Sequence, residues 1–387
     1  MNIFLFLAGL FFLTLALGRV LERFNIPWIF SALFLGFGAA VYNPFSSITQ
    51  GPVFDFLATL GIYFLLFIIG FEMDFKRIAQ SGTFIFKTAM GIILAEGILG
   101  SILVHYVFGT PWMISFLVGI SFATVGEAVL LPILQRFNII NTSLGRMIIG
   151  VGVLDDLIEI ITIIALSVLI GNAQGHTSAK ITTLLLVFTV MFTLAYLLTF
   201  LRKEARKDLK HFSQPTIFLL SLFIIFVFVG IGSYADAAAL GALLAGIALK
   251  NFLPAQKQKT IDKTINAVAY GLFAPVFFFA VGLETDIAFL LASPLLVFGV
   301  ILFVNVVKIL ASWAFTKNEL GSQQSIILGI ALTVKFSTSI VIIKMLFDQG
   351  LIDSALYSVL IASTAIFKFI VPTLMSQLIT RWSIAKT

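Results

Sequence analysis

The stretch VGVLDDLIEI, residues 151–160, places two adjacent carboxylates, Asp155 and Asp156, in an otherwise apolar segment. Apolar residues on both sides extend this segment to the length of a membrane span, about 18–25 residues. On insertion scales, a charged side chain at the centre of a membrane helix costs about 2.5–3.5 kcal/mol. Two acids side by side are therefore expected only where they have a task, such as carrying an ion.

The composition indicates an integral membrane protein along the whole chain. Of the 387 residues, 60% are hydrophobic and 11% are charged, and the mean hydropathy is +1.11. A soluble domain of this length cannot bury so much apolar surface. The apolar runs are continuous rather than alternating, which excludes a transmembrane barrel. The chain has no cysteine, which excludes disulfides and thiolate metal sites. The sequence therefore predicts an all-α membrane protein.

The apolar runs predict about thirteen transmembrane helices, the first of which is a span and not a cleaved signal peptide. They lie at residues 3–21, 27–42, 54–71, 83–107, 111–136, 144–170, 180–201, 215–234, 236–250, 265–288, 293–316, 323–347 and 354–378. Of the 24 basic residues, eighteen fall in one set of alternating connections, and only Lys180 falls in the other. The positive-inside rule then places the N-terminus outside and the C-terminus in the cytoplasm. This distribution explains the pI of about 9.4 without a nucleic-acid partner.

Two pairs of stretches repeat at a spacing of about 210 residues. FIIGFEMDF (67–75) and FAVGLETDI (279–287) share the pattern F-x-x-G-x-E-x-D, and SALFLGFGAA (31–40) resembles GALLAGIALK (241–250). The copies are seven spans apart, an odd number, so they cross the membrane in opposite directions. Inverted repeats are typical of secondary transporters; chance similarity of two apolar runs is the alternative.

The repeat predicts the organisation of the chain. We expect a single membrane transport domain over residues 1–387, with repeat one at about 1–170, a connector helix at about 180–201 and repeat two at about 215–378. No soluble regulatory domain is expected. Spans four to six and eleven to thirteen are expected to form an ion-carrying core, and spans one to three and eight to ten a panel against which the core moves.

Two repeat-equivalent spans contain residues that interrupt a helix, SFATVGEAVLLPIL (121–134) and GIALTVKFSTSIVI (329–342). Unwound backbone at membrane depth is tolerated only where it is buried or lines a cavity. We therefore predict two crossed discontinuous helices at the transport site, lined by Thr124, Glu127, Lys335, Ser337 and Thr338. Glu127 and Lys335 either offset the partial charges of helix ends or form a direct ion pair.

Carboxylates suit the exchange of protons for cations, because a carboxylate binds either one but not both at once. Burial and a neighbouring acid both favour the protonated form, and two adjacent acids titrate as a coupled pair. For Na+, we expect oxygen ligands from Asp156, Asp155 and the region of Thr124, together with water. Glu159 is an additional acid on the helical face of Asp155; it either binds an ion or balances a lysine such as Lys368.

Five stretches in this order resemble bacterial Na+/H+ antiporters of the monovalent cation:proton antiporter superfamily, in the branch that includes the glutathione-gated potassium efflux proteins. They are ALGRVLERFNIPWIFSALFLGFG, LGIYFLLFIIGFEMDFKRI, ALGALLAGIALKN, LFAPVFFFAVGLETDI and NTSLGRMIIGVGVLDDLIEII. The resemblance implies that Asp156 is the essential carrier and that Asp155 marks an electrogenic member. It also implies that Lys308 pairs with Asp155.

The resemblance has further consequences for mechanism and setting. If Na+ breaks a bridge between Asp155 and Lys308, the lysine becomes a second proton carrier and two protons move per cation; a permanent structural bridge is the alternative. The resemblance also implies a homodimer in the bacterial inner membrane, with a role in pH homeostasis.

The sequence therefore predicts a secondary active transporter that exchanges Na+ or Li+ for H+ by alternating access. The alternative is a K+/H+ antiporter or potassium efflux protein, although the stretch KFSTS (335–339) differs from those relatives. A second alternative is a sodium-coupled organic anion symporter of similar fold. No H-E-x-x-H, nucleophile or phosphate-loop motif is present, so neither an enzyme nor a cofactor is expected.

Overall fold

The computed structural model describes most of the chain. The described residues are 2–23, 26–73, 82–123, 125, 130, 133–135, 137–173, 178–334, 337–382 and 384. Side chains are described for all of these except residues 123, 156, 159, 169–173, 178–181, 202–211, 337–338, 367–369 and 372–373. Within this part of the chain the regular structure is helical, without strands.

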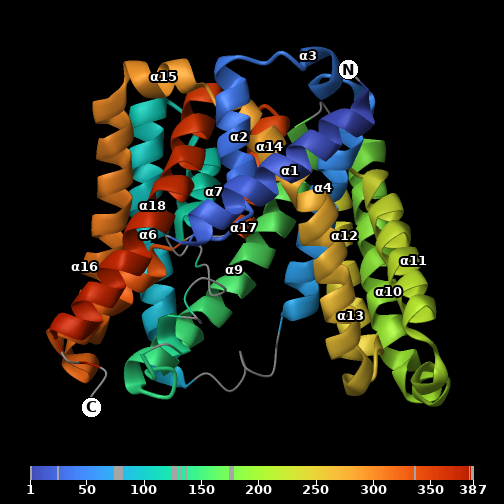
Figure 1. The fold of residues 1–387 in the computed structure, drawn as a ribbon. Helices are drawn as coiled ribbons and strands as arrows, with labels where there is room; N and C mark the ends of the chain where they lie inside the picture. Colours follow the sequence, from blue (N-terminus) through green and yellow to red (C-terminus); the bar gives the residue numbers. More distant parts are fainter. Residues whose placement is uncertain are drawn as a thin grey trace. The chain divides into compact units, whose positions relative to one another are not determined.

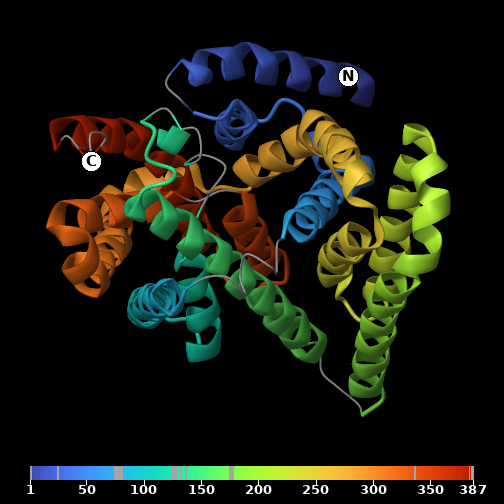
Figure 2. The same ribbon diagram turned by 90° about the horizontal axis from the view of Figure 1, so that it is seen from below.

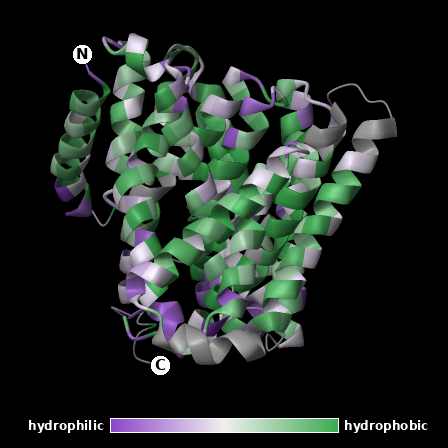
Figure 3. Cartoon of the chain, turned by 90° about the vertical axis from the view of Figure 1, so that its right-hand side faces the viewer, coloured by the Kyte–Doolittle hydropathy of each residue, from purple (hydrophilic) through white to green (hydrophobic). Residues whose placement is uncertain are grey.

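Seven helical stretches in the described residues are long and apolar enough to cross a membrane. They are α1 (Ile3–Glu22), α4 (Pro52–Glu72), α6 (Thr83–Phe108), the stretch Thr182–Leu201 of α10 (Ser178–His211), α11 (Gln214–Ser233), the stretch Ala255–Leu283 and α16 (Pro294–Leu332). Figure 3 shows apolar residues along the helices and hydrophilic residues gathered toward helix ends. The all-helical membrane fold predicted from the composition is confirmed.

The chain divides into two compact units. The first unit contains Met1–Phe11, Phe45–Met73 and Ile163–Ala280, and the second contains Phe12–Pro44, Asp74–Thr162 and Val281–Thr387. The remaining helices of the first unit are α3 (Ser46–Thr49), α12 (Ala238–Phe252), α13 (Ala255–Val268), the π-helical turn η1 (Ala269–Phe273) and most of α14 (Ala274–Leu283). The second unit adds α2 (Phe30–Val41), α7 (Trp112–Ala123), most of α9 (Ser143–Ala173), α15 (Ile287–Ala292), α17 (Ser337–Asp348) and α18 (Ser354–Arg381) (Figure 1).

In the first unit, α12 packs against both α4 and α11 (Figure 2). The crossing with α4 depends on two glycines. A Cβ atom at Gly70 would overlap the carbonyl of Leu243, and one at Gly246 would overlap the carbonyl of Phe67. Small residues allow membrane helices to approach at backbone distance. The glycine of the repeated F-x-x-G-x-E-x-D pattern is therefore a packing residue in its first copy.

The second unit contains the corresponding crossing. A Cβ atom at Gly282, the glycine in the second copy of the pattern, would overlap the carbonyl of Leu33 and approach Gly36 in α2. Leu33 and Gly36 precede Leu243 and Gly246 by 210 residues each. In both copies of the pattern the glycine therefore makes the same kind of contact, each with the equivalent residue of the other repeated stretch.

The predicted interrupted span at residues 329–342 contains the end of α16 and the start of α17. At Gly321 the φ angle is +76°, a conformation that favours glycine, and the chain of α16 turns there. The two parts of α16 then pack together: a Cβ atom at Gly329 would lie against the backbone of Ile309, and Thr316 and Ser325 hydrogen-bond through their hydroxyls at 2.8 Å. After Leu332 the helix ends, and α17 begins at Ser337.

Most helix ends lie within a few residues of the predicted ones, with two clear differences. The tenth predicted span begins at residue 265, but the helical stretch that contains it begins ten residues earlier, at Ala255. Helix α10 continues to His211, ten residues beyond the predicted end at 201. The added residues, RKEARKDLKH, are mostly Lys, Arg, Glu, Ala and Leu. These residues have high helix propensity, so the helix continues after the apolar run has ended.

Candidate ion-binding site

The candidate site lies in the second unit, where α7 and α16 both end. The ammonium of Lys308 donates hydrogen bonds to the carbonyl of Phe122, at 3.3 Å, and to the carbonyl of Leu332, at 2.9 Å. These carbonyls belong to the last turns of α7 and α16, which carry partial negative charge and whose carbonyls have no N–H donor within the helix. A single ammonium group thus caps the C-terminal ends of both α7 and α16.

Lys308 also forms an ion pair. Its Nζ lies 3.1 Å from Oε2 of Glu96, and each of the two side chains is only 1% exposed. Glu96 comes from α6, which packs against α7 and α16. Burying two charges carries a desolvation cost that close geometry and further hydrogen bonds must offset. The carbonyl contacts of Lys308 provide such bonds.

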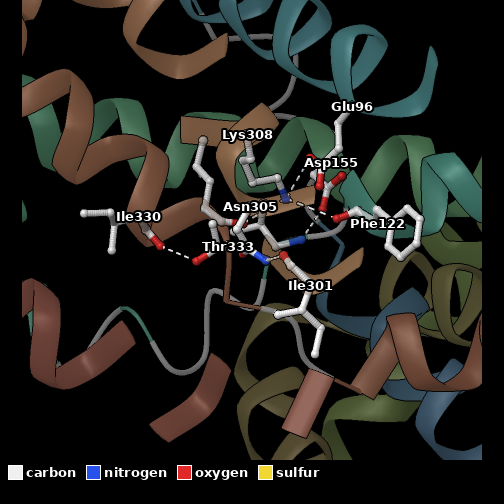
Figure 4. A network of polar contacts seen from close by, with 10 residues as sticks. Glu96, Phe122, Asp155, Ile301, Asn305, Lys308, Ile330 and Thr333 are labelled. Carbon is white, nitrogen blue, oxygen red and sulfur yellow. Dashed lines mark hydrogen bonds and ion pairs between the residues drawn. The ribbon is translucent and has the colours of Figure 1, made fainter. Parts of the chain in front are cut away.

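Asp155 is the third member of this group. It lies on α9, is 1% exposed, and its Oδ2 accepts a hydrogen bond from the backbone N–H of Val125, just beyond the end of α7. Figure 4 shows the side chains of Glu96, Asp155 and Lys308 converging, with the Phe122 carbonyl beside them. Asp155 and Lys308 thus belong to one polar network, and the predicted bridge between them stays a prediction.

Two polar side chains accompany Lys308 in Figure 4. Asn305, one turn earlier in α16, donates from Nδ2 to the carbonyl of Ile301 at 2.6 Å. Thr333, at the C-terminal cap of α16, donates from its hydroxyl to the carbonyl of Ile330 at 2.7 Å. Both side chains are buried and engage backbone carbonyls near the lysine.

The other predicted site residues are described only in part. Asp156 and Glu159 lie on α9, and Ser337 and Thr338 begin α17, but their side chains are outside the description. Thr124, Glu127, Lys335 and Lys368 also lie outside the described residues or side chains. Their roles in ion binding stay predictions.

Glu96 is the residue of this network that the sequence analysis does not predict, because its partner Lys308 lies on another helix, far away in the sequence. The sequence EGILGS (96–101) did contain a signal. A Cβ atom at Gly119 of α7 would overlap the carbonyl of Gly97, so the small residues on α6 hold α7 at backbone distance. That close approach keeps Glu96 near the end of α7.

The network has a charge imbalance that fits cation chemistry. Among its described groups, the carboxylates of Glu96 and Asp155 face one ammonium, that of Lys308. Binding one proton or one monovalent cation makes this group formally neutral, and neutrality is strongly favoured where water is excluded. Carboxylate oxygens are hard ligands of the kind that alkali cations prefer.

The helical membrane fold with two helices ending at a buried charge network defines the class of protein, a secondary transporter. The chain belongs to the sodium/hydrogen exchanger family, because the model of that family's transmembrane region matches residues 7–382.

Relatives support this assignment along nearly the whole chain. A probable Na+/H+ antiporter of Methanocaldococcus jannaschii is 25% identical over 365 residues, which cover 93% of this chain and 92% of the relative. A Na+/H+ antiporter of Enterococcus hirae is 24% identical over 372 residues, covering 92% and 93%. The glutathione-regulated potassium-efflux protein KefC of Escherichia coli K12 is 27% identical over 270 residues, 67% of this chain but 42% of KefC.

The solved structure of the sodium proton antiporter MjNhaP1 of Methanocaldococcus jannaschii at pH 8 has a similar fold. The TM-score is 0.59 at 18% sequence identity, and the alignment covers 98% of this chain and 97% of that one. This likeness confirms the antiporter fold predicted from the sequence.

Proposed function

We propose that the protein exchanges Na+ or Li+ for H+ across a bacterial inner membrane by alternating access. The observation that carries the proposal is the buried Asp155 carboxylate beside the Lys308–Glu96 pair, at the end of α7. A carboxylate in this position binds a proton or a cation but not both, and competition at a site with alternating access is sufficient for exchange. The two Na+/H+ antiporter relatives support the choice of ions.

The proposed carriers are the adjacent aspartates. Asp156 binds the cation with help from Asp155 and oxygen near Thr124, and the same oxygens take up protons when the cation leaves. Glu127, Lys335, Ser337 and Thr338 line the site at the two interrupted helices, and Glu159 is an additional acid nearby. Lys308 serves as a second proton carrier, which gives two protons per cation and an electrogenic cycle.

The proposed architecture is an inverted repeat. Repeat one covers about residues 1–170 and repeat two about 215–378, joined by a connector helix at about 180–201. The matching glycine contacts, Gly70 on Leu243 and Gly282 on Leu33, support this symmetry because equivalent residues make them. The protein acts as a homodimer, with its N-terminus outside and its C-terminus in the cytoplasm.

The first test is transport in proteoliposomes that carry a pH-sensitive dye, with addition of Na+, Li+ or K+. Native protein is compared with Asp156→Asn, with Asp155→Asn and with Asp55→Asn, which changes an exposed acid in α4. Sodium-driven proton movement that is lost in Asp156→Asn but kept in Asp55→Asn supports the proposal. Unchanged transport in Asp156→Asn would contradict it. Dependence on membrane potential that is lost in Asp155→Asn supports the two-proton cycle.

The similarity to KefC makes K+/H+ exchange or potassium efflux the second candidate. The same experiment separates the two, since a response to K+ without one to Na+ or Li+ assigns the protein to the potassium group.

A further inference from the structure

Lys308 has partners on several elements, and only one of them is a predicted cation ligand. Its ammonium contacts Glu96 on α6 and the carbonyls of Phe122 and Leu332, while Asp155 belongs to the same network (Figure 4). Glu96 is as deeply buried as Lys308, and helices α6 and α16 pack side by side. This arrangement offers the lysine a carboxylate other than the aspartates that are proposed to bind the cation.

A second carboxylate matters because of what a cation does on arrival. The cation and the ammonium compete for the same aspartate oxygens, and the displaced ammonium must stay inside the protein. A buried charge that loses its only partner is strongly destabilised. Glu96, at 3.1 Å, and the two helix-end carbonyls hold the ammonium without help from Asp155.

We propose that Glu96 is a positioning residue for ion exchange, the counter-ion that holds Lys308 away from the aspartates while the cation is bound. The inference rests on the proposed function and deepens it. The charge of Glu96 sets the affinity for the cation, because it determines how strongly the ammonium competes for Asp155. The movement of Lys308 toward Glu96 precedes any proton release by the lysine, so it is compatible with either stoichiometry.

The experiment measures equilibrium binding of radioactive ²²Na+ to the purified full-length protein in detergent, for the native chain, Glu96→Gln and Glu96→Asp. Glu319→Gln is the matched control, because Glu319 is an exposed acid in α16. We expect Glu96→Gln to raise the Kd about tenfold, with Glu96→Asp between it and the native protein and Glu319→Gln unchanged. In proteoliposomes the KM should rise by a similar factor, and kcat should change less. A purely structural role would lower the yield of folded protein but leave the Kd of the folded fraction as it is.

A second comparison tests whether Glu96 acts through Lys308. In a Lys308→Gln background there is no ammonium to hold, so adding Glu96→Gln should change the Kd by less than about twofold. The double variant Lys308→Gln/Glu96→Gln replaces both buried charges, so it leaves neither charge unpaired. It can therefore still be measured if Glu96→Gln alone fails to fold.

The outcomes are distinct. A Kd for Glu96→Gln within about twofold of the native value would overturn the inference alone, as would an undiminished tenfold loss in the Lys308→Gln background. Native protein that neither binds nor transports Na+ or Li+ would overturn both the inference and the proposed function.

Discussion

Among its described residues, the second unit contains two lysine-centred ion clusters that differ chiefly in their exposure to solvent. Lys308 and Glu96 form an ion pair in which each side chain is 1% exposed, and Lys308 also donates hydrogen bonds to the carbonyls of two helix ends. Lys344, on α17, pairs with Glu284 at 3.1 Å and with Asp348 one turn later; its side chain is 9% exposed, but those of the two acids are 36% and 38% exposed. Both clusters link segments far apart in the sequence.

The difference shows which cluster depends on its ion pairing. Acids that keep about a third of their surface in solvent remain partly hydrated whether or not a lysine is present, so such pairs contribute little. Acids without that access depend on nearby cations and hydrogen-bond donors. We infer that Lys344 ties α17 to the segment after α14 through Glu284. A separate hydrogen bond ties α18 to α14, because Tyr357 donates to the Val281 carbonyl at 3.0 Å. The Lys308 network is instead sensitive to any change of charge.

The largest effect is expected for Lys308→Met. This change removes the ammonium that faces Glu96 and the donor for the carbonyls of Phe122 and Leu332. Breaking a buried pair from one side costs about 3–5 kcal/mol. Thermal unfolding in detergent, followed by tryptophan fluorescence, should show a large loss of stability. The double variant Lys308→Met/Glu96→Gln should recover part of it, since no charged member of the pair remains. If Lys308→Met were as stable as the native protein, the buried cluster would depend on its ion pair no more than the exposed one does.

A smaller effect is expected for Lys344→Met. The methionine fills much of the space of the lysine stem, and Glu284 and Asp348 keep their access to solvent. The expected loss is about 1 kcal/mol, at the upper end for pairs with exposed partners. Cation transport should persist. The same unfolding measurement, run beside Lys308→Met, tests the ranking, and a loss equal to that of Lys308→Met would show that exposure of the acids does not decide the cost.

Much of the fold, but less of the site, could be predicted from the sequence. Apolar runs predicted the spans, and glycine, proline and polar residues within them predicted that spans five and twelve would be interrupted; in the structure, α7 ends at Ala123 and α16 ends at Leu332. The pairing of Lys308 with Glu96 was not predictable, because it depends on how far one helix is displaced along another. Glycines indicate where helices approach closely, as Gly119 of α7 does on Gly97 of α6, but they carry no charge pattern that identifies the ion partner on a third helix.

The repeat was predictable for a related reason. A glycine followed two residues later by an acid recurs at Gly70 and Gly282, and a backbone contact of this kind tolerates no side chain in either copy. The acids that follow differ in their surroundings. Lys250 donates to the backbone carbonyl of Glu72, whereas Lys344 pairs with the side chain of Glu284. The two copies thus share their glycine packing contacts but not their charge partners. Similarity between the two stretches therefore predicts the packing and does not predict the charge partners.

The smallest effect is expected for Asp348→Asn, which removes the charge of one exposed acid from the Lys344 cluster. Lys344 keeps Glu284 as a partner, and the asparagine can still accept a hydrogen bond from the lysine one turn earlier in α17. An exposed pair at this helical spacing contributes about 0.3–0.5 kcal/mol, and salt screens it. Unfolding at low and at high salt should therefore differ between Asp348→Asn and native protein only at low salt. A salt-independent loss as large as that of Lys344→Met would mean that Asp348 is held in a fixed geometry that its exposure does not reveal, and the two clusters would then differ in position but not in kind.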